Sequence, residues 1–132
     1  MNNYLQTAFS GWAGVILFGS RLAMPYLLRR MPGAKMPFLR RMWPHYWLGY
    51  LAFFVSFAHA GIAMRSGNMR GISSAGVWTA TVALLVTQWQ IAMGLMLRNP
   101  TQPNRRTLRR THFWTIALVA GLIVVHIALN RP

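Results

Sequence analysis

The chain has 132 residues, 55% of them hydrophobic, and it carries 14 Lys plus Arg but no Asp, no Glu and no Cys. This composition excludes thiolate-bound iron–sulfur clusters, covalent haem attachment, disulfides, Ser-His-Asp triads and paired-carboxylate hydrolysis. The cations do not indicate nucleic-acid binding, because they lie in short stretches between long apolar segments, as in integral membrane proteins.

Four apolar segments are long enough to cross a bilayer, which takes about 20 residues. They run from Tyr4 to Met24, from Pro44 to Met64, from Ser74 to Leu97 and from Thr111 to Leu129. Short connections rich in Pro, Gly and Asn separate them. The pattern predicts an all-α integral membrane four-helix bundle that forms a single domain over residues 1–132. The first span is expected to remain in place, because no basic residue precedes it and no convincing cleavage site follows.

The distribution of cations predicts the orientation of the four spans. Eleven flank the first and third connections: Arg21, Arg29, Arg30, Lys35, Arg40, Arg41, Arg98, Arg105, Arg106, Arg109 and Arg110. Three lie near the second connection and the C-terminus: Arg65, Arg70 and Arg131. Basic loops stay in the cytoplasm, so both termini are expected outside, with the chain in a bacterial inner membrane.

The four histidines form two pairs with one spacing. His45 and His59 are 14 residues apart, and so are His112 and His126. Fourteen residues is about four helical turns and about 21 Å of rise, which returns both side chains to nearly the same face. In each half of the chain an Arg-Arg pair and a His-aromatic-Trp motif open the span that contains the histidines. Two such halves form a parallel repeat, in which the second and fourth spans run in the same direction.

This repeat predicts two haem sites. His45 is expected to meet His112 near the cytoplasmic side, and His59 to meet His126 near the outer side. Pairs about 21 Å apart cannot share one ion, and no Cys, Asp or Glu completes a tetrahedral site. Haem iron needs only two axial nitrogens, so we predict two haem b groups with these pairs as ligands. The imidazoles are expected to be neutral, each with its second nitrogen on a backbone carbonyl or a hydroxyl. The alternative role is hydrogen bonding between helices.

Other polar residues of the spans have two interpretations each. Arg41, Arg109 and Arg110 are candidate partners of haem propionates, but snorkelling and topology also explain their positions. Gln88 and Gln90 lie on different faces of the third span. A quinone headgroup is a candidate ligand for them, but hydrogen bonding between helices is the favoured role.

The histidine-bearing spans resemble known proteins. Paired His-x13-His helices are similar to those in the cytochrome b of quinol–cytochrome c reductases. The run from Leu108 to Trp114, with Val125-His126 at the far end of the span, resembles small bacterial di-haem b cytochromes and ferric-reductase-like transmembrane domains. The resemblance implies axial ligands at His45, His59, His112 and His126. Quinol-oxidising relatives use a carboxylate near their site, and this chain has none.

These features predict transmembrane electron transfer through two bis-histidine b-type haems. We expect a cytochrome b subunit of a larger redox complex rather than a stand-alone enzyme. Its expected partners are membrane lipids and other redox subunits, with quinone as a further candidate. One alternative is a self-contained oxidoreductase of the quinone/superoxide or ferric reductase type. Another is a pigment-binding or structural subunit of a photosynthetic or respiratory complex.

Overall fold

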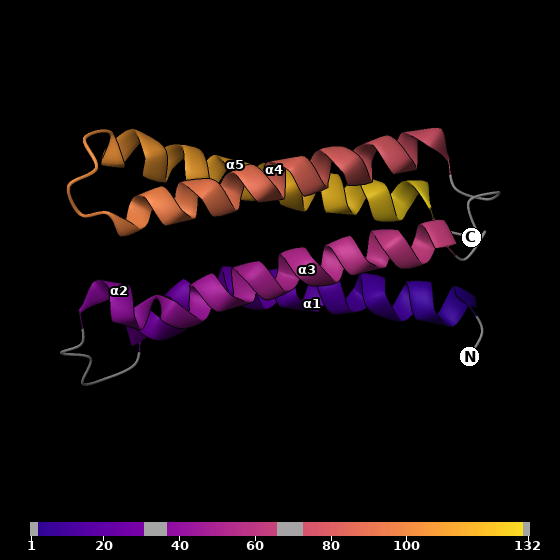
Figure 1. Cartoon of the computed structure of the whole chain (residues 1–132), viewed down its shortest axis with the longest axis horizontal. Helices are drawn as coiled ribbons and strands as arrows, with labels where there is room; N and C mark the ends of the chain where they lie inside the picture. Colours follow the sequence, from indigo (N-terminus) through magenta and orange to yellow (C-terminus); the bar gives the residue numbers. More distant parts are fainter. Residues whose placement is uncertain (1–2, 31–36, 66–72, 131–132) are drawn as a thin grey trace. The chain divides into compact units, whose positions relative to one another are not determined.

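The chain is all-α in a computed structural model, which describes residues 3–30, 37–65 and 73–130. The helices are α1 (Asn3–Arg30), α2 (Phe38–Arg41), α3 (Trp43–Arg65), α4 (Ser74–Arg98) and α5 (Arg105–Leu129), as Figure 1 shows. The four long helices are each long and apolar enough to cross a membrane. The predicted all-α membrane class with four spans is therefore confirmed.

The helices extend beyond two of the predicted spans. α1 continues six residues past Met24 to Arg30, and α5 begins at Arg105, six residues before Thr111. The added turns are rich in arginine, which is a good helix former although it lowers the apolar character used to delimit a span. α2 lies where only a connection was expected. α3 and α4 match their predicted bounds within one residue.

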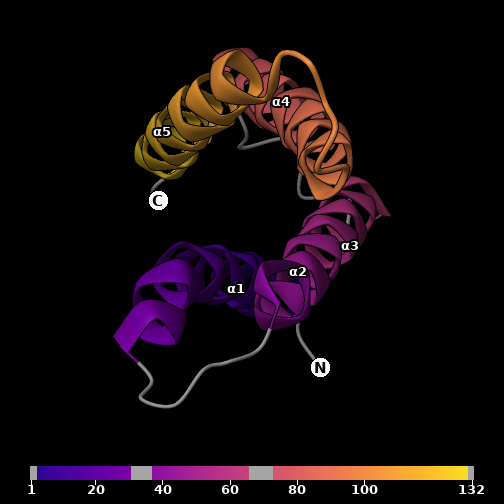
Figure 2. The same ribbon diagram turned by 90° about the vertical axis from the view of Figure 1, so that its left-hand side faces the viewer.

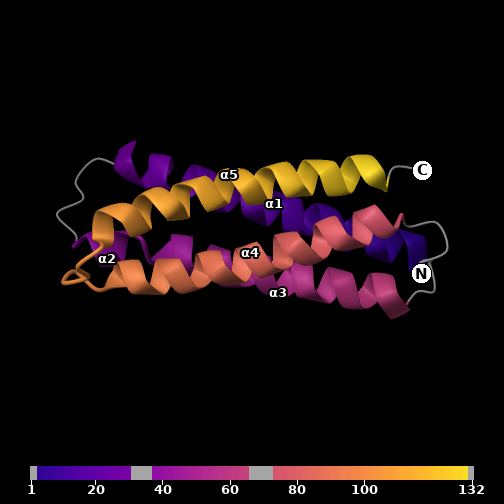
Figure 3. The same cartoon turned by 90° about the horizontal axis from the view of Figure 1, so that it is seen from above.

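The chain divides into two compact units, residues 1–62 and 63–132. In the first unit α1 and α3 lie side by side, joined by hydrogen bonds between their side chains and backbones. In the second unit α4 and α5 form an antiparallel hairpin around the connection 99–104, which Figure 3 shows. Figure 2 shows the two helices of each unit end-on. Whether the four helices form one domain stays a prediction.

Local hydrogen bonds define the ends of α4. The Ser73 hydroxyl accepts from the Gly76 backbone N–H at 2.9 Å, which makes Ser73 the N-cap. At the other end, Arg105 Nη1 donates to the carbonyl oxygens of Leu97 (2.8 Å) and Asn99 (2.7 Å). The first residue of α5 thus satisfies carbonyls that the last turn of α4 leaves without helical partners.

Few side chains are fully buried among the residues that the structure describes. Met93 and Val119 are 1% exposed in the second unit, and Ala52 is 4% exposed in the first. Large apolar side chains such as Phe9 and Trp78 are exposed instead. An outward apolar surface over a small interhelical core is the arrangement that a lipid environment favours.

Met93 gives a direct test of packing between α4 and α5. We expect Met93→Ala to lower the free energy of unfolding by about 2 kcal/mol or more, because it leaves a cavity in a fully buried position. Met96→Ala is the matched control, since Met96 on the same helix is exposed, and its effect should stay within about 0.5 kcal/mol. Thermal or denaturant unfolding in detergent measures both, and equal losses would contradict this packing.

Candidate functional site

The histidines lie on heptad stripes of α3 and α5. Each stripe has a histidine, a buried apolar residue and a second histidine at intervals of seven residues: His45, Ala52 and His59 on α3, and His112, Val119 and His126 on α5. A seven-residue interval keeps side chains on the seam that faces a neighbouring helix. Both histidines of each pair therefore lie along the line where the helix packs against the first helix of its own unit.

His45 is buried against α1, and a proline explains its partner. Its Nδ1 lies 3.2 Å from the carbonyl oxygen of Arg21. In a regular helix that oxygen would accept from the N–H of residue 25, but residue 25 is proline, which has no N–H. The Arg21 carbonyl can only accept a hydrogen bond, so the contact places the proton of His45 on Nδ1.

His59 contacts α1 near the opposite end. Its Nδ1 lies 3.0 Å from the Ser10 hydroxyl, and that hydroxyl donates to the Thr7 carbonyl oxygen at 3.0 Å. Because the single hydroxyl proton is used there, Ser10 Oγ accepts from His59 Nδ1–H. The ring packs on Gly11, where an added Cβ would lie 3.1 Å from His59 Cε1. A glycine at this position gives the imidazole room beside the backbone of α1.

His126 makes the corresponding contact in the second unit. Its Nδ1 lies 3.0 Å from the Gly76 carbonyl oxygen and 3.2 Å from Asn130 Nδ2. The Gly76 oxygen only accepts and is the nearer of the two, so we assign the proton to Nδ1; the Asn130 amide donates to the His126 carbonyl oxygen at 2.7 Å. His126 thus has the same proton position as His45 and His59.

These contacts define one tautomer for three histidines. A neutral imidazole that carries its proton on Nδ1 has its lone pair on Nε2. Ligand histidines are commonly oriented in this way, with the other ring N–H donated to a carbonyl or another acceptor. The predicted contact of the second nitrogen with a carbonyl or hydroxyl is therefore confirmed for His45, His59 and His126.

The surroundings of His112 differ. Its side chain lies near Gly94, where an added Cβ would be 3.8 Å from His112 Cε1, and its backbone carbonyl oxygen accepts from Gln90 Nε2 at 3.3 Å. Gln90 is fully buried and Gln88 is exposed, as expected for residues on different faces of α4. Hydrogen bonding between helices, the favoured role for the glutamines, is thus confirmed for Gln90.

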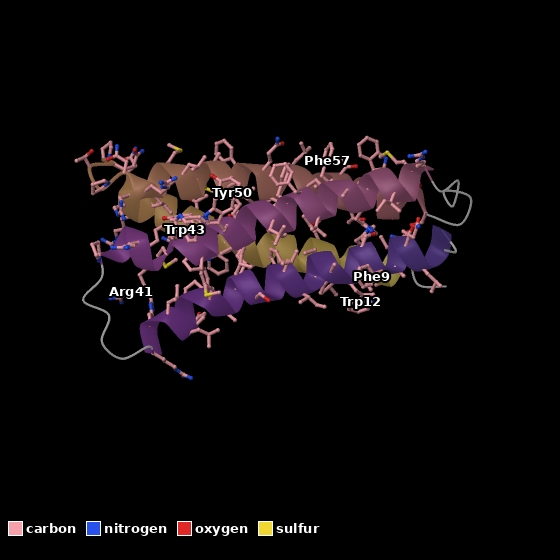
Figure 4. All side chains as sticks on the ribbon, turned by 60° about the horizontal axis from the view of Figure 1, so that its bottom comes forward. Phe9, Trp12, Arg41, Trp43, Tyr50 and Phe57 are labelled. Carbon is pink, nitrogen blue, oxygen red and sulfur yellow. The ribbon has the colours of Figure 1, made fainter. Side chains whose placement is uncertain are left out.

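The predicted arginines lie at the helix ends. Arg41 ends α2, at the same end of the first unit as Trp43, while Phe9 and Trp12 lie toward the other end (Figure 4). Arg109 and Arg110 are exposed in the first turns of α5. Their proposed contacts with propionates stay predictions. The pairing of His45 with His112 and of His59 with His126 also stays a prediction, because each pair takes one residue from each unit.

Arg21 is a residue whose burial the sequence analysis does not predict. The cation count includes it with the basic residues flanking the first connection, and within α1 it is only 3% exposed. The available signal was its position four residues before Pro25, which leaves its carbonyl oxygen without the usual helical donor. Ser10 and Gly76, the other two acceptors, carry no comparable signal in the sequence.

Comparisons of the chain with protein-family models, with curated proteins and with solved structures found no match. The functional interpretation therefore depends on the chemistry of the residues themselves.

Nitrogen NMR can test the tautomer directly. In ¹⁵N-histidine-labelled protein we expect His45, His59 and His126 to be protonated on Nδ1 and unprotonated on Nε2, because each Nδ1 faces an acceptor. Single His→Gln variants assign the signals. Protonation on Nε2 in the neutral form of any of the three would contradict its assignment.

Pro25→Ala tests why the Arg21 carbonyl accepts from His45. Alanine restores an N–H four residues after Arg21, so the carbonyl gains a competing helical donor. We expect the hydrogen bond from His45 Nδ1–H to the Arg21 carbonyl to weaken. The Nδ1 proton of His45 should then exchange several-fold faster with water. His59 in the same variant is the internal control, because its acceptor is Ser10. An unchanged His45 signal would show that the proline does not determine this contact.

Proposed function

We propose that this protein is a transmembrane electron carrier that holds two haem b groups, each between one histidine of α3 and one of α5. The observation that carries the proposal is that Nδ1 of His45, His59 and His126 each lies within hydrogen-bond distance of an oxygen of the neighbouring helix, which assigns the lone pair to Nε2. The equal 14-residue spacing on α3 and α5 supports the pairing of the histidines.

The donor set fits haem better than a bare metal ion. The whole chain offers four imidazoles and no thiolate or carboxylate side chain, and the two histidines of each helix are about 21 Å apart along its axis. Two nitrogen donors at one level leave a zinc or copper ion with an incomplete shell. A porphyrin supplies four further nitrogens, so two protein ligands complete its iron.

The protein residues would orient and protect such a site. The hydrogen bonds from Nδ1 hold each ring against a fixed acceptor, which keeps its rotation and basicity constant. Gly11 lets the His59 ring approach the helix backbone, and the burial of His45 keeps its ring away from water. What a bis-histidine haem supplies is reversible one-electron transfer, since its iron has no open position for a substrate.

The proposal includes location and partners. The basic connections would lie in the cytoplasm of a bacterium and the chain in its inner membrane, as the cation distribution favours. Two haems separated by about 21 Å along the helices would carry electrons across most of the bilayer. Other redox subunits would supply the donor and acceptor, and the exposed apolar surface gives them and the lipids an area to contact.

Absorption spectroscopy of single histidine variants tests this function. The purified full-length protein should show a b-type reduced spectrum with about two haems per chain. His45→Ala and His112→Ala should each lower this to about one and remove the same haem, as judged by the remaining midpoint potential. His59→Ala and His126→Ala should each remove the other haem.

Gln88→Ala is the control, because Gln88 is an exposed polar residue of a helix that has no histidine. It should leave the haem content unchanged. A protein that stays colourless in haem-replete cells would refute the function. If His45→Ala and His59→Ala removed one shared haem, the pairing alone would be wrong.

A further inference from the structure

Arg21 places a buried cation inside a membrane-spanning helix. It lies within the span Leu5–Arg30 and is 3% exposed. Its side chain crosses α3 at Gly49, where an added Cβ would lie 3.4 Å from Arg21 Nε and 3.6 Å from Cζ. The guanidinium therefore lies beside α3 at Gly49, one turn after His45.

No side-chain carboxylate of this chain can neutralise that charge. Among the described residues, Arg21 Nη1 is buried and has no hydrogen-bond partner. The sequence contains neither Asp nor Glu. An arginine stays protonated in proteins, and an unpaired buried charge in a membrane is costly, so such residues normally mark a functional site with a partner.

We infer that Arg21 binds an oxyanion, a carboxylate or phosphate group, that a membrane-embedded molecule brings to the first unit. The planar guanidinium matches both groups, because its N–H donors form two parallel hydrogen bonds to their oxygens. Two sources carry this chemistry: the phosphate of an acidic phospholipid and the propionate of a haem. The second source rests on the proposed function, whereas the first does not.

The haem source is tested with a ligand that lacks the charge. Full-length protein in phosphatidylcholine nanodiscs is loaded with haem or with haem dimethyl ester, whose propionates are blocked. If Arg21 binds a propionate, the wild type should prefer haem by about tenfold or more, as expected for a charge-assisted hydrogen bond. Arg21→Gln should abolish that preference, and Arg21→Lys should keep part of it.

The lipid source is tested without haem. The unfolding temperature of the wild type should be about 5 °C higher in phosphatidylglycerol than in phosphatidylcholine nanodiscs if Arg21 binds a phospholipid phosphate. Arg21→Gln should remove this difference. Arg29→Gln is the matched control for both arms, since Arg29 is an exposed arginine of the same helix and should change neither preference.

The outcomes separate the two proposals. A protein that binds no haem yet shows the lipid effect refutes the proposed function and keeps the anion site. Preferences that persist in Arg21→Gln, or that are absent from the wild type in both arms, overturn the anion site even if two haems are bound. If Arg21→Gln does not fold, Arg21→Lys decides, because an unchanged preference in that variant would exclude a guanidinium-specific site.

Discussion

The hydrogen bonds from histidine Nδ1 to the first helix of each unit are the constraint on which the site depends. A polar ring inside a membrane must find its partners within the protein, because the hydrocarbon offers none. His45 and His59 find theirs at Arg21 and Ser10 on α1, and His126 finds its partner at Gly76 on α4. In the first unit these two contacts fix the register of α3 along α1, and they fix the tautomer of each ring.

The 14-residue spacing has two interpretations that the geometry reconciles. Fourteen residues are two heptads, the interval that keeps side chains on a helix–helix seam, and the same interval suits two ligand levels. Packing between helices uses Nδ1, whereas ligation requires the lone pair, which this tautomer places on Nε2. A histidine in this tautomer can therefore contact the neighbouring helix through Nδ1 and bind a ligand through Nε2, so the two roles are not alternatives.

The sequence predicted the helices and the kind of histidine contact, because both follow from local pattern. Apolar length identifies a span, and a neutral ligand imidazole needs an acceptor for its other nitrogen. The acceptors themselves depend on how α1 and α4 are aligned with their neighbours, which no local pattern gives. Ser10 is one hydroxyl among several in the chain, and only the register of α3 brings it to His59.

The burial of Arg21 shows the same limit of sequence-based prediction for a charged residue. Counting cations treats every arginine near a connection alike. Arg21, which lies against Gly49 of the neighbouring helix, is buried, whereas Arg29, the next arginine along α1, is exposed. Arg21 lies against α3 at Gly49, where a Cβ would be at ordinary contact distance from the guanidinium, 3.4 Å from Nε. The burial of Arg21 thus depends on how α1 packs against a helix whose contacting residue is 28 positions away in the sequence.

The position of Arg21 links the inferred anion site to the proposed haem ligand. Its carbonyl oxygen holds His45 Nδ1, and its side chain lies over Gly49, one turn further along α3. An anion bound at the guanidinium would hold the side chain against α3 and so keep the carbonyl in line with the imidazole. Because the chain has no acidic side chain, such an anion would have to come from an outside molecule, while the hydrogen bond from His45 Nδ1 to the Arg21 carbonyl is present without it.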